Sequence, residues 1–329
     1  DVFGQTVNPW NSALTPGGSS GGTAVSLAAG MVSLGHGTDL GGSLRHPAQA
    51  CGIASIKPTL GRVADLVPSE PEAPMGMQLM NTDGPMARRV ADVRLGLQTM
   101  ATKDWRDPWW MPVPLEMSDK SDLPIAVIID PLNAGVSEQV ASGVKHAANL
   151  LAKAGYTVEE VEPPGLADAF RIWKTICLSE LLNGLKPAVE EICGAALLKA
   201  LDHYQMTMPD LTIEKYHHAF SERRQVLRDW MGFFQNYSAI IAPVSTVPPQ
   251  VIDNDIATAA TTESTIESMR MVVAINALGL PSAVVPVGSS DNLPQVVQII
   301  GQPFDEMWCL SLAETIEKHV DALTPINPH

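Results

Sequence analysis

Paired cysteines, aromatic side chains and basic residues are all scarce in this 329-residue chain, and each shortage excludes a class of protein. Its four cysteines form no C-x-x-C pair, which argues against a disulfide scaffold and a structural zinc site: Cys51, Cys177, Cys193 and Cys309. Aromatic residues make up 5% of a chain that is 45% hydrophobic, so the core must be mainly aliphatic. We therefore expect reduced thiols and a cytoplasmic protein.

Basic residues number 21 against 36 acidic ones, which gives a formal charge of −15. Such a surface repels nucleic-acid phosphates and anionic membranes, so we expect the chain to bind neither. The longest uncharged run, residues 2 to 38, is interrupted by glycine, proline and asparagine. Its apolar part, residues 23 to 34, is too short to span a bilayer, and we predict no transmembrane segment.

The chain begins at Asp1 and shows no charged-then-apolar leader. We expect that the true N-terminus of the protein lies elsewhere.

Short apolar runs alternate with longer amphipathic ones, which is typical of an α/β fold. We predict strands at 124 to 130, 237 to 243, 281 to 288 and 294 to 301, the last two joined as a hairpin through SSDNL. We predict helices at 21 to 31, 89 to 101, 136 to 154, 213 to 235, 261 to 278 and 304 to 320.

The absence of a flexible linker favours a single domain over residues 1 to 329. Its chemistry-bearing core would occupy residues 1 to 101, and the final strands and helix residues 237 to 320. The middle, about 165 to 235, would be a helical excursion from the sheet. Two proline-containing segments, 68 to 85 and 104 to 116, are expected to be connections.

Asp39 and Arg45 are the only charged residues between Asp1 and Lys57, and both stand close to Ser43. Two glycines precede Ser43, and the stretch that follows has the pattern of a helix start, where free N–H groups favour developing negative charge. A serine there suits acyl transfer, with the hydroxyl attacking a carbonyl. On residue type alone, however, Ser43 could simply cap the helix, as could Ser19 or Ser20 for the helix near Gly21.

Residues 17 to 63 as a whole resemble the amidase signature family. The matching blocks are GGSSGG, then GTDLGGSLRHPA, then GIASIKPTLGRV. Supporting blocks are TDGPMARRVADV at 82 to 93 and NALGLPSAVVPVG with LPQVVQIIG between 276 and 301. The middle third carries little of the pattern. The resemblance implies a central mixed, twisted sheet covered by helices on both faces.

The resemblance also implies a Ser, cis-Ser, Lys triad, with Ser43 as nucleophile and Ser19 as a bridging serine on a cis peptide. The backbone N–H groups of the oxyanion hole would belong to Leu40, Gly41, Gly42 and Ser43. Supporting roles would fall to Gly18, Ser20, Thr38, Asp39 and Arg45. A hydroxyl has no useful basicity, so Ser19 would relay a proton to a buried, neutral lysine.

That lysine is missing from the matching part of this sequence. In the family it lies upstream of the glycine-serine motif, but no lysine precedes Ser19 here. The first in the chain, Lys57, matches the K of the KPT block, which is not the catalytic position. We expect the base in an N-terminal part outside this sequence, and residues 1 to 329 alone to be nearly inactive.

Other catalytic patterns are weaker. His36 and His46 flank Ser43 and could suggest a Ser-His-acid triad, but no G-x-S-x-G elbow is present. The glycine pairs could suggest a phosphate-binding P-loop, but the lysine that such a loop needs is missing after Gly22. Ser142 and Lys145 satisfy S-x-x-K without the KTG of a β-lactamase. We expect Cys51 in the core, and His217 and His218 on a solvated helix face rather than at a metal site.

The function that we predict is cleavage of a carbon–nitrogen acyl bond in a small-molecule amide, with an aryl amide, ester or carbamate as further options, without a metal or cofactor. Residues 75 to 80 and three tryptophans would pack loops or line an apolar pocket: Trp105, Trp109 and Trp110. Two alternatives stay open, the glutaminase subunit of a tRNA-dependent amidotransferase and a non-enzymatic fragment. A homodimer is also possible.

Overall fold

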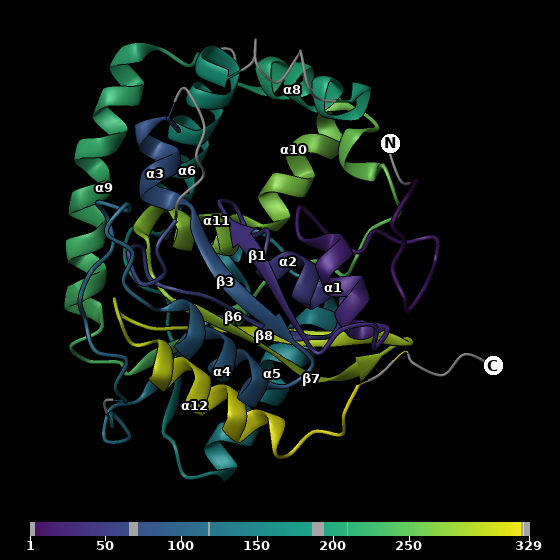
Figure 1. Ribbon diagram of the computed structural model, residues 1–329, viewed down its shortest axis with the longest axis vertical. Helices are drawn as coiled ribbons and strands as arrows, with labels where there is room; N and C mark the ends of the chain where they lie inside the picture. The colour runs from purple at the N-terminus through teal and green to yellow at the C-terminus, as the bar shows by residue number, and fades with distance from the viewer. Residues whose placement is uncertain are drawn as a thin grey trace.

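The computed structural model describes residues 4–65, 72–117, 119–185, 194–208, 210–323 and 325. Within them, eight strands form one mixed sheet in the order β1-β3-β2-β7-β8-β6-β4-β5 (Figure 1). The strands are β1 (Leu34–Asp39), β2 (Ala54–Lys57), β3 (Thr82–Ala87), β4 (Ile125–Val127), β5 (Val158–Glu160), β6 (Ala239–Pro243), β7 (Ser282–Ser290) and β8 (Leu293–Ile300). Neighbours from β1 to β6 pair antiparallel, and β4 pairs parallel with both β5 and β6.

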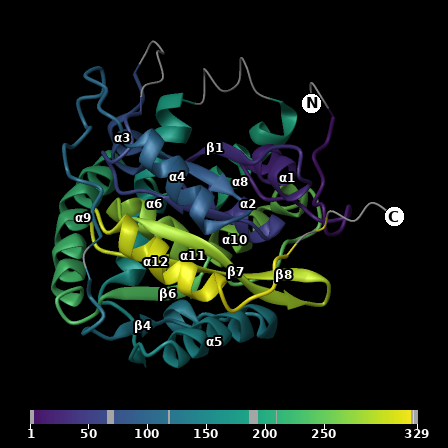
Figure 2. The ribbon, with the colours of Figure 1, turned by 60° about the horizontal axis from the view of Figure 1, so that its bottom comes forward.

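Helices cover both faces of this sheet, as the sequence resemblance implies. One face carries α4 (Val90–Met100), α5 (Glu138–Lys153) and α12 (Glu306–Glu317). The other carries α1 (Gly21–Ala28), α2 (Arg45–Cys51), α6 (Leu166–Glu180) and α11 (Arg270–Leu278). In Figure 2, α12 lies across the front of the final strands, with α11 behind the sheet.

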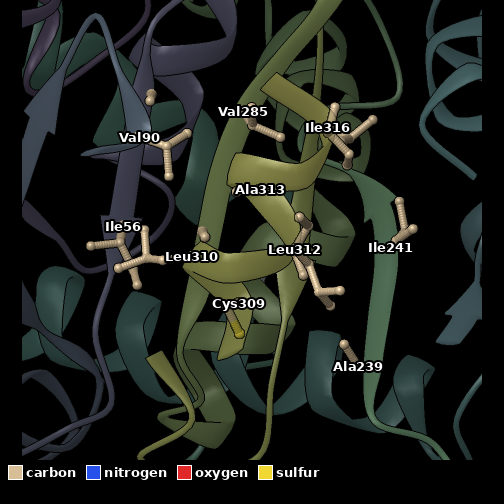
Figure 3. Close-up of a cluster of buried hydrophobic side chains, with 14 of the residues drawn as sticks. Ile56, Val90, Ala239, Ile241, Val285, Cys309, Leu310, Leu312, Ala313 and Ile316 are labelled. Carbon is tan, nitrogen blue, oxygen red and sulfur yellow. The ribbon is translucent and has the colours of Figure 1, made fainter. Parts of the chain in front are cut away.

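The strand pattern explains the two faces, because successive side chains of a strand point to opposite sides. In β6, Ala239 and Ile241 belong to the cluster under α12, and Ile240 and Ala242 to the cluster under α11. Figure 3 shows Leu310, Leu312 and Ile316 of α12 facing the strands. Truncating a buried leucine such as Leu312 to alanine generally costs about 2–5 kcal/mol.

All four predicted strands are confirmed, and the predicted hairpin joins β7 to β8 through Asp291 and Asn292. The predicted helices are confirmed, except that 261 to 278 is broken into α10 (Ala259–Ser268) and α11 at Met269. The helix start expected after Ser43 is confirmed by α2. Four strands or helices near the site lie where no element was predicted or where a connection was: β1, β2, β3 and α3 (Met75–Met80). The connection predicted at 68 to 85 is therefore wrong over α3 and the start of β3, while residues 68 to 71 of it lie outside the described residues.

The middle of the chain is helical. It holds α6, the π-helical turn η2 (Leu181–Leu185), α8 (Ala195–Thr207) and α9 (Ile213–Phe233). α9 forms an outer column against α6, and α8 lies against α10 at the top of Figure 1. Two short 3₁₀ turns, η1 (Pro131–Asn133) and η3 (Asn254–Ile256), complete the described elements. Among these, no helix is both long and apolar enough to cross a bilayer.

Candidate active site

Ser43 lies in the tight turn between the end of β1 and the start of α2, and its side chain is half-buried. Gly42 has φ +105°, a conformation that residues with a Cβ rarely adopt. Its carbonyl accepts the N–H of His46 at 2.7 Å, which starts the helix. The residues that follow β1 are thus bent so that Ser43 stands at the entrance to α2.

The buried carboxylate of Asp39, the last residue of β1, stabilises this turn by accepting hydrogen bonds from its backbone. It accepts the N–H of Gly42 at 2.7 Å and the N–H of Leu44 at 3.3 Å, on either side of Ser43. It also pairs with the Arg45 guanidinium, whose Nε lies 2.9 Å away. Burial alone would raise the pKa of Asp39, but Arg45, the charge of Lys57 and the Asn276 hydrogen bond together outweigh it, and the pKa lies below its usual value.

The glycine-serine motif comes close to this turn although it is about 24 residues upstream. The Gly18–Ser19 peptide is cis, and the next N–H, that of Ser20, donates to the Ser43 carbonyl at 3.3 Å. Ser20 is half-buried against Gly37 of β1, where an added Cβ would lie 2.5 Å from its Oγ. Ser19 itself is exposed.

The backbone N–H groups proposed for the oxyanion hole are not equivalent in this structure. The N–H of Gly42 is donated to Asp39, whereas no hydrogen bond between described residues engages the N–H of Gly41 or Ser43. Leu40 is fixed from the opposite side, because its carbonyl accepts Trp173 Nε1 of α6 at 2.8 Å. Thr38 is exposed in β1, opposite Asp83 of β3.

A cavity of about 310 Å³ opens between the two motifs. Gly18 and Gly41 form part of its wall, and Trp173, Met269 and Val273 supply apolar surface. The Trp173 ring lies so close to Gly41 that a Cβ there would stand 2.5 Å from it. The cavity wall also includes polar groups such as Tyr204 and Asp255, so the cavity offers an acyl or aryl group an apolar patch within a mixed lining.

A second cavity, of about 470 Å³, lies on the Leu40 side of the turn. Met77 of α3 and Trp109 line it, and Trp109 Nε1 donates to Gln78 at 3.1 Å. Trp105 is 84% exposed and lines neither cavity. Of the residues considered for an apolar pocket, only some thus face a cavity.

Lys57 is fully buried at the end of β2, where Nζ donates to the Pro58 carbonyl at 2.8 Å. Burial lowers the pKa of Lys57 to about 7, and the charge of Arg45 acts in the same direction. No hydrogen bond joins Ser19 to any lysine that the structure describes.

The weaker catalytic patterns find no geometric support in the described residues. His36 is exposed and lies 3.2 Å from Asp83, and neither it nor His46 hydrogen bonds to Ser43. Burial lowers the pKa of His46 to about 4 and raises that of Cys51 to about 12. Ser142 is exposed on α5.

The predicted solvated helix face is confirmed, since His217 and His218 are exposed on α9. No cluster of metal-ligating side chains occurs in the described part of the chain. Cys193 falls outside the described residues, and the other three cysteines are free and buried.

Three functional candidates were missed by sequence reasoning: Trp173, Asn276 and Gln298. Asn276 and Gln298 do lie inside the blocks NALGLP and PQVVQIIG, where an amide within an apolar run is the available signal. Trp173 gave none, because it is one aromatic residue on an ordinary amphipathic helix.

The chain matches the family described as Amidase over residues 1–310. It is 37% identical over 325 residues to the indoleacetamide hydrolase of Bradyrhizobium diazoefficiens, covering 98% of this chain and 62% of that protein. It is 30% identical to a glutamyl-tRNA(Gln) amidotransferase subunit of Staphylococcus saprophyticus, covering 96% and 69%. The solved glutamyl-tRNA(Gln) amidotransferase subunit from Thermotoga maritima superimposes with a TM-score of 0.80 at 26% identity, covering 99% and 71%. The chain thus spans less than two thirds of the first of these relatives.

Proposed function

This chain belongs to the amidase signature family, and on that premise we propose that it carries the nucleophile of an amidohydrolase that cleaves a carbon–nitrogen acyl bond. The observation that carries the proposal is the contact between the two motifs. Ser43 stands in a glycine turn fixed by Asp39, its carbonyl accepts the N–H of Ser20, and Gly18 and Gly41 of the two motifs line one cavity.

The Ser43 hydroxyl attacks the amide carbonyl carbon and gives its proton to Ser19, whose own proton passes to a neutral lysine. The free N–H groups of Gly41 and Ser43 receive the oxyanion. The tetrahedral intermediate then loses its amine, which takes up the proton, and acyl-Ser43 remains. Water attacks this ester, releasing a carboxylic acid and restoring Ser43.

The lysine that completes the relay is proposed to come from residues outside these 329. Ser19 is exposed, so its hydroxyl is accessible to such a residue. Lys57 is unsuited because its ammonium is engaged with Pro58.

For the substrate we propose a small neutral amide with an aryl group, of which indoleacetamide is the first to test. Trp173, Met269 and Val273 suit a flat apolar group, and the similarity to an indoleacetamide hydrolase points the same way. A glutaminase role within an amidotransferase is the second candidate, since the Staphylococcus saprophyticus protein is 30% identical to this chain. We also place the protein in the cytoplasm, because its three described cysteines are free.

A fluorophosphonate probe followed by peptide mass spectrometry tests the nucleophile, in protein that includes the proposed lysine-bearing part, because residues 1 to 329 alone are expected to be nearly inactive. We expect labelling at Ser43, abolished in Ser43→Ala and slowed in Ser19→Ala, but unchanged in Ser142→Ala, which removes an exposed serine of the S-x-x-K pattern. Labelling at another residue would reject the assignment.

Substrate class is tested separately, by following ammonia release from indoleacetamide and from glutamine. Indoleacetamide turnover supports the first candidate. Turnover of glutamine but not of indoleacetamide, and only when a partner subunit is added, would favour the glutaminase candidate.

A further inference from the structure

The turn that holds Ser43 is fixed by a chain of buried contacts that leads to Asn276 of α11, which is 237 residues from Asp39 in sequence. Both N–H groups that flank Ser43, those of Gly42 and Leu44, donate to Asp39. The position of Ser43 therefore depends on where the Asp39 carboxylate lies.

Asn276 of α11 contacts that carboxylate with one end of its amide and the Arg45 guanidinium with the other. Its Nδ2 lies 2.9 Å from Asp39 Oδ1 and 2.8 Å from the Asp39 carbonyl, and it also donates to the Met80 carbonyl at 3.2 Å. Its Oδ1 accepts Arg45 Nη2 at 2.6 Å. Asn276 is fully buried, so no water substitutes for these partners.

Gln298 of β8 provides a second anchor for Arg45. Its Oε1 accepts Arg45 Nη1 at 3.2 Å and the Ser282 hydroxyl at 2.8 Å. Its Nε2 donates to the Pro243 carbonyl of β6 at 2.8 Å, so the amide cannot turn without breaking a bond to the sheet.

α11 and the residue before it also form the wall of the cavity beside Ser43. Met269 and Val273 line the cavity, and Val272 packs on Gly42, where an added Cβ would lie 2.4 Å from its methyl group. The Val272 carbonyl accepts Arg45 Nη2 at 3.0 Å. One helix thus contacts the space for the acyl group and the residues that hold the nucleophile.

We propose that Asn276 is a positioning residue for the reaction of Ser43, acting through Asp39 and Arg45. The proposal rests on the proposed function of Ser43. It assigns to Asn276 no contact with the substrate. Its effect is on the rate at which bound substrate is attacked, not on binding.

The first test compares fluorophosphonate labelling of Asn276→Leu with that of wild type, both in protein that includes the proposed lysine-bearing part. Because a shift of about 1 Å in a reacting group generally slows reaction about 100-fold, we expect a loss of that order in the maximal labelling rate. The probe concentration that gives the half-maximal rate should not change. Leu312→Ala, on the opposite face of the sheet, is the control for lost stability. If Asn276→Leu lost no more of its maximal labelling rate than a control variant such as Leu312→Ala with the same fall in Tm, the proposal would be overturned.

The second test uses pH to separate positioning from packing. In Asn276→Asp the new carboxylate faces Asp39 and Arg45, with the Lys57 ammonium also near Asp39. Ionised, it lacks the donor and repels Asp39, whereas its protonated form has an O–H to donate. Labelling relative to wild type should therefore recover as pH falls in Asn276→Asp and stay constant in Asn276→Leu. Parallel pH profiles for both variants would contradict the assignment.

Hydrogen exchange makes the inference independent of catalysis. The N–H groups of Gly42 and Leu44 should exchange faster in Asn276→Leu than in wild type. Unchanged exchange would refute the inference that Asn276 fixes the turn through Asp39. If wild-type protein that includes the proposed lysine-bearing part is not labelled at Ser43, the proposed function fails, while faster exchange in the variant still establishes that Asn276 fixes the turn through Asp39.

Discussion

Gly42 is the residue at which the backbone of the site depends most on the absence of a side chain. Its φ is +105°, and a Cβ would lie 2.4 Å from Val272 and 2.8 Å from Met269. A left-handed conformation generally costs an L-residue about 1–2 kcal/mol, and overpacking about 1–3 kcal/mol more. Gly42→Ala should therefore lower the free energy of unfolding in urea by a few kcal/mol and largely abolish labelling of Ser43.

Gly232→Ala is the matched control, because Gly232 is helical in α9 and a Cβ there meets nothing within 4 Å. Alanine in a helix is favoured over glycine by about 0.5–1 kcal/mol, so this variant should be slightly stabilised and labelled normally. Equal losses in the two variants would show that the Gly42 geometry is not what matters.

Lys57 gives a pH dependence whose sign follows from its burial. Its pKa falls from an ordinary 10.5 to about 7 on folding, so between these values the unfolded chain binds more protons than the folded one. Stability from this group therefore rises as pH increases from about 7 to about 10.5. In Lys57→Met this rise should disappear, so the wild-type minus variant difference in unfolding free energy should increase with pH.

The lost hydrogen bond to Pro58 lowers the stability of Lys57→Met by a pH-independent amount of about 1 kcal/mol, so only the slope is diagnostic. Urea unfolding at several pH values measures it. A difference that stays flat from neutral to alkaline pH would mean that Lys57 does not titrate in this range.

The residues near Ser43 were predictable because their types and spacing are unusual, whereas their partners were not. Two charged residues in a long neutral stretch drew attention to Asp39 and Arg45. Nothing in the spacing indicated that Asn276 would complete their hydrogen bonds, since that contact exists only once α11 packs beside β1. The N–H of Gly42, expected in the oxyanion hole from resemblance, instead donates to Asp39 in this structure.

At the scale of elements, hydrophobic runs identified the buried central strands but not the strands that carry the site. β6 and β7 contain continuous Ala, Val and Ile, which are typical of strands buried on both faces. β1 reads LGHGTD and β3 reads TDGPMA, and both contain residues that disfavour strands. They form because they pair with each other in register from Leu34 with Ala87 to Asp39 with Thr82, a non-local effect.

The break between α10 and α11 was missed for a similar reason. Apolar periodicity continues through Met269, which favoured one helix. Arg270 is buried, and its guanidinium donates to the carbonyls of Pro131, Glu267 and Gly135 and to Asp130. The partners among residues 130 to 135 are distant in sequence, and they fix the start of α11 in a way that a local pattern cannot show.

The β7–β8 hairpin yields a prediction at this scale. Its turn residues, Asp291 and Asn292, have φ values of +52° and +61°, as a two-residue type I′ turn requires. Asn292→Val places a β-branched side chain in the left-handed region and should reduce stability by about 1–2 kcal/mol in urea unfolding. Asn292→Gly should be neutral or stabilising, and the opposite order of the two variants would contradict this turn geometry.

For the whole molecule, the formal charge of −15 makes self-repulsion a term in stability. The main buried ion pairs, Asp39 with Arg45 and Arg62 with Glu306, are shielded from salt, whereas most of the excess acidic groups lie at the surface. Raising the ionic strength from about 10 mM to about 150 mM shortens the Debye length from about 30 Å to about 8 Å. Repulsion between distant surface charges then weakens, so Tm should rise.

Exposed ion pairs act in the opposite direction, because salt weakens them too. Arg106 with Asp104 and Arg171 with Glu222 are examples, but exposed pairs generally contribute only about 0–1 kcal/mol each. Replacing Glu160, exposed on the edge strand β5, by Gln removes one excess charge and should reduce the salt-dependent rise in Tm. Calorimetry at both ionic strengths measures this. A Tm that falls with salt would mean that local ion pairs, not net charge, dominate the electrostatics of this fold.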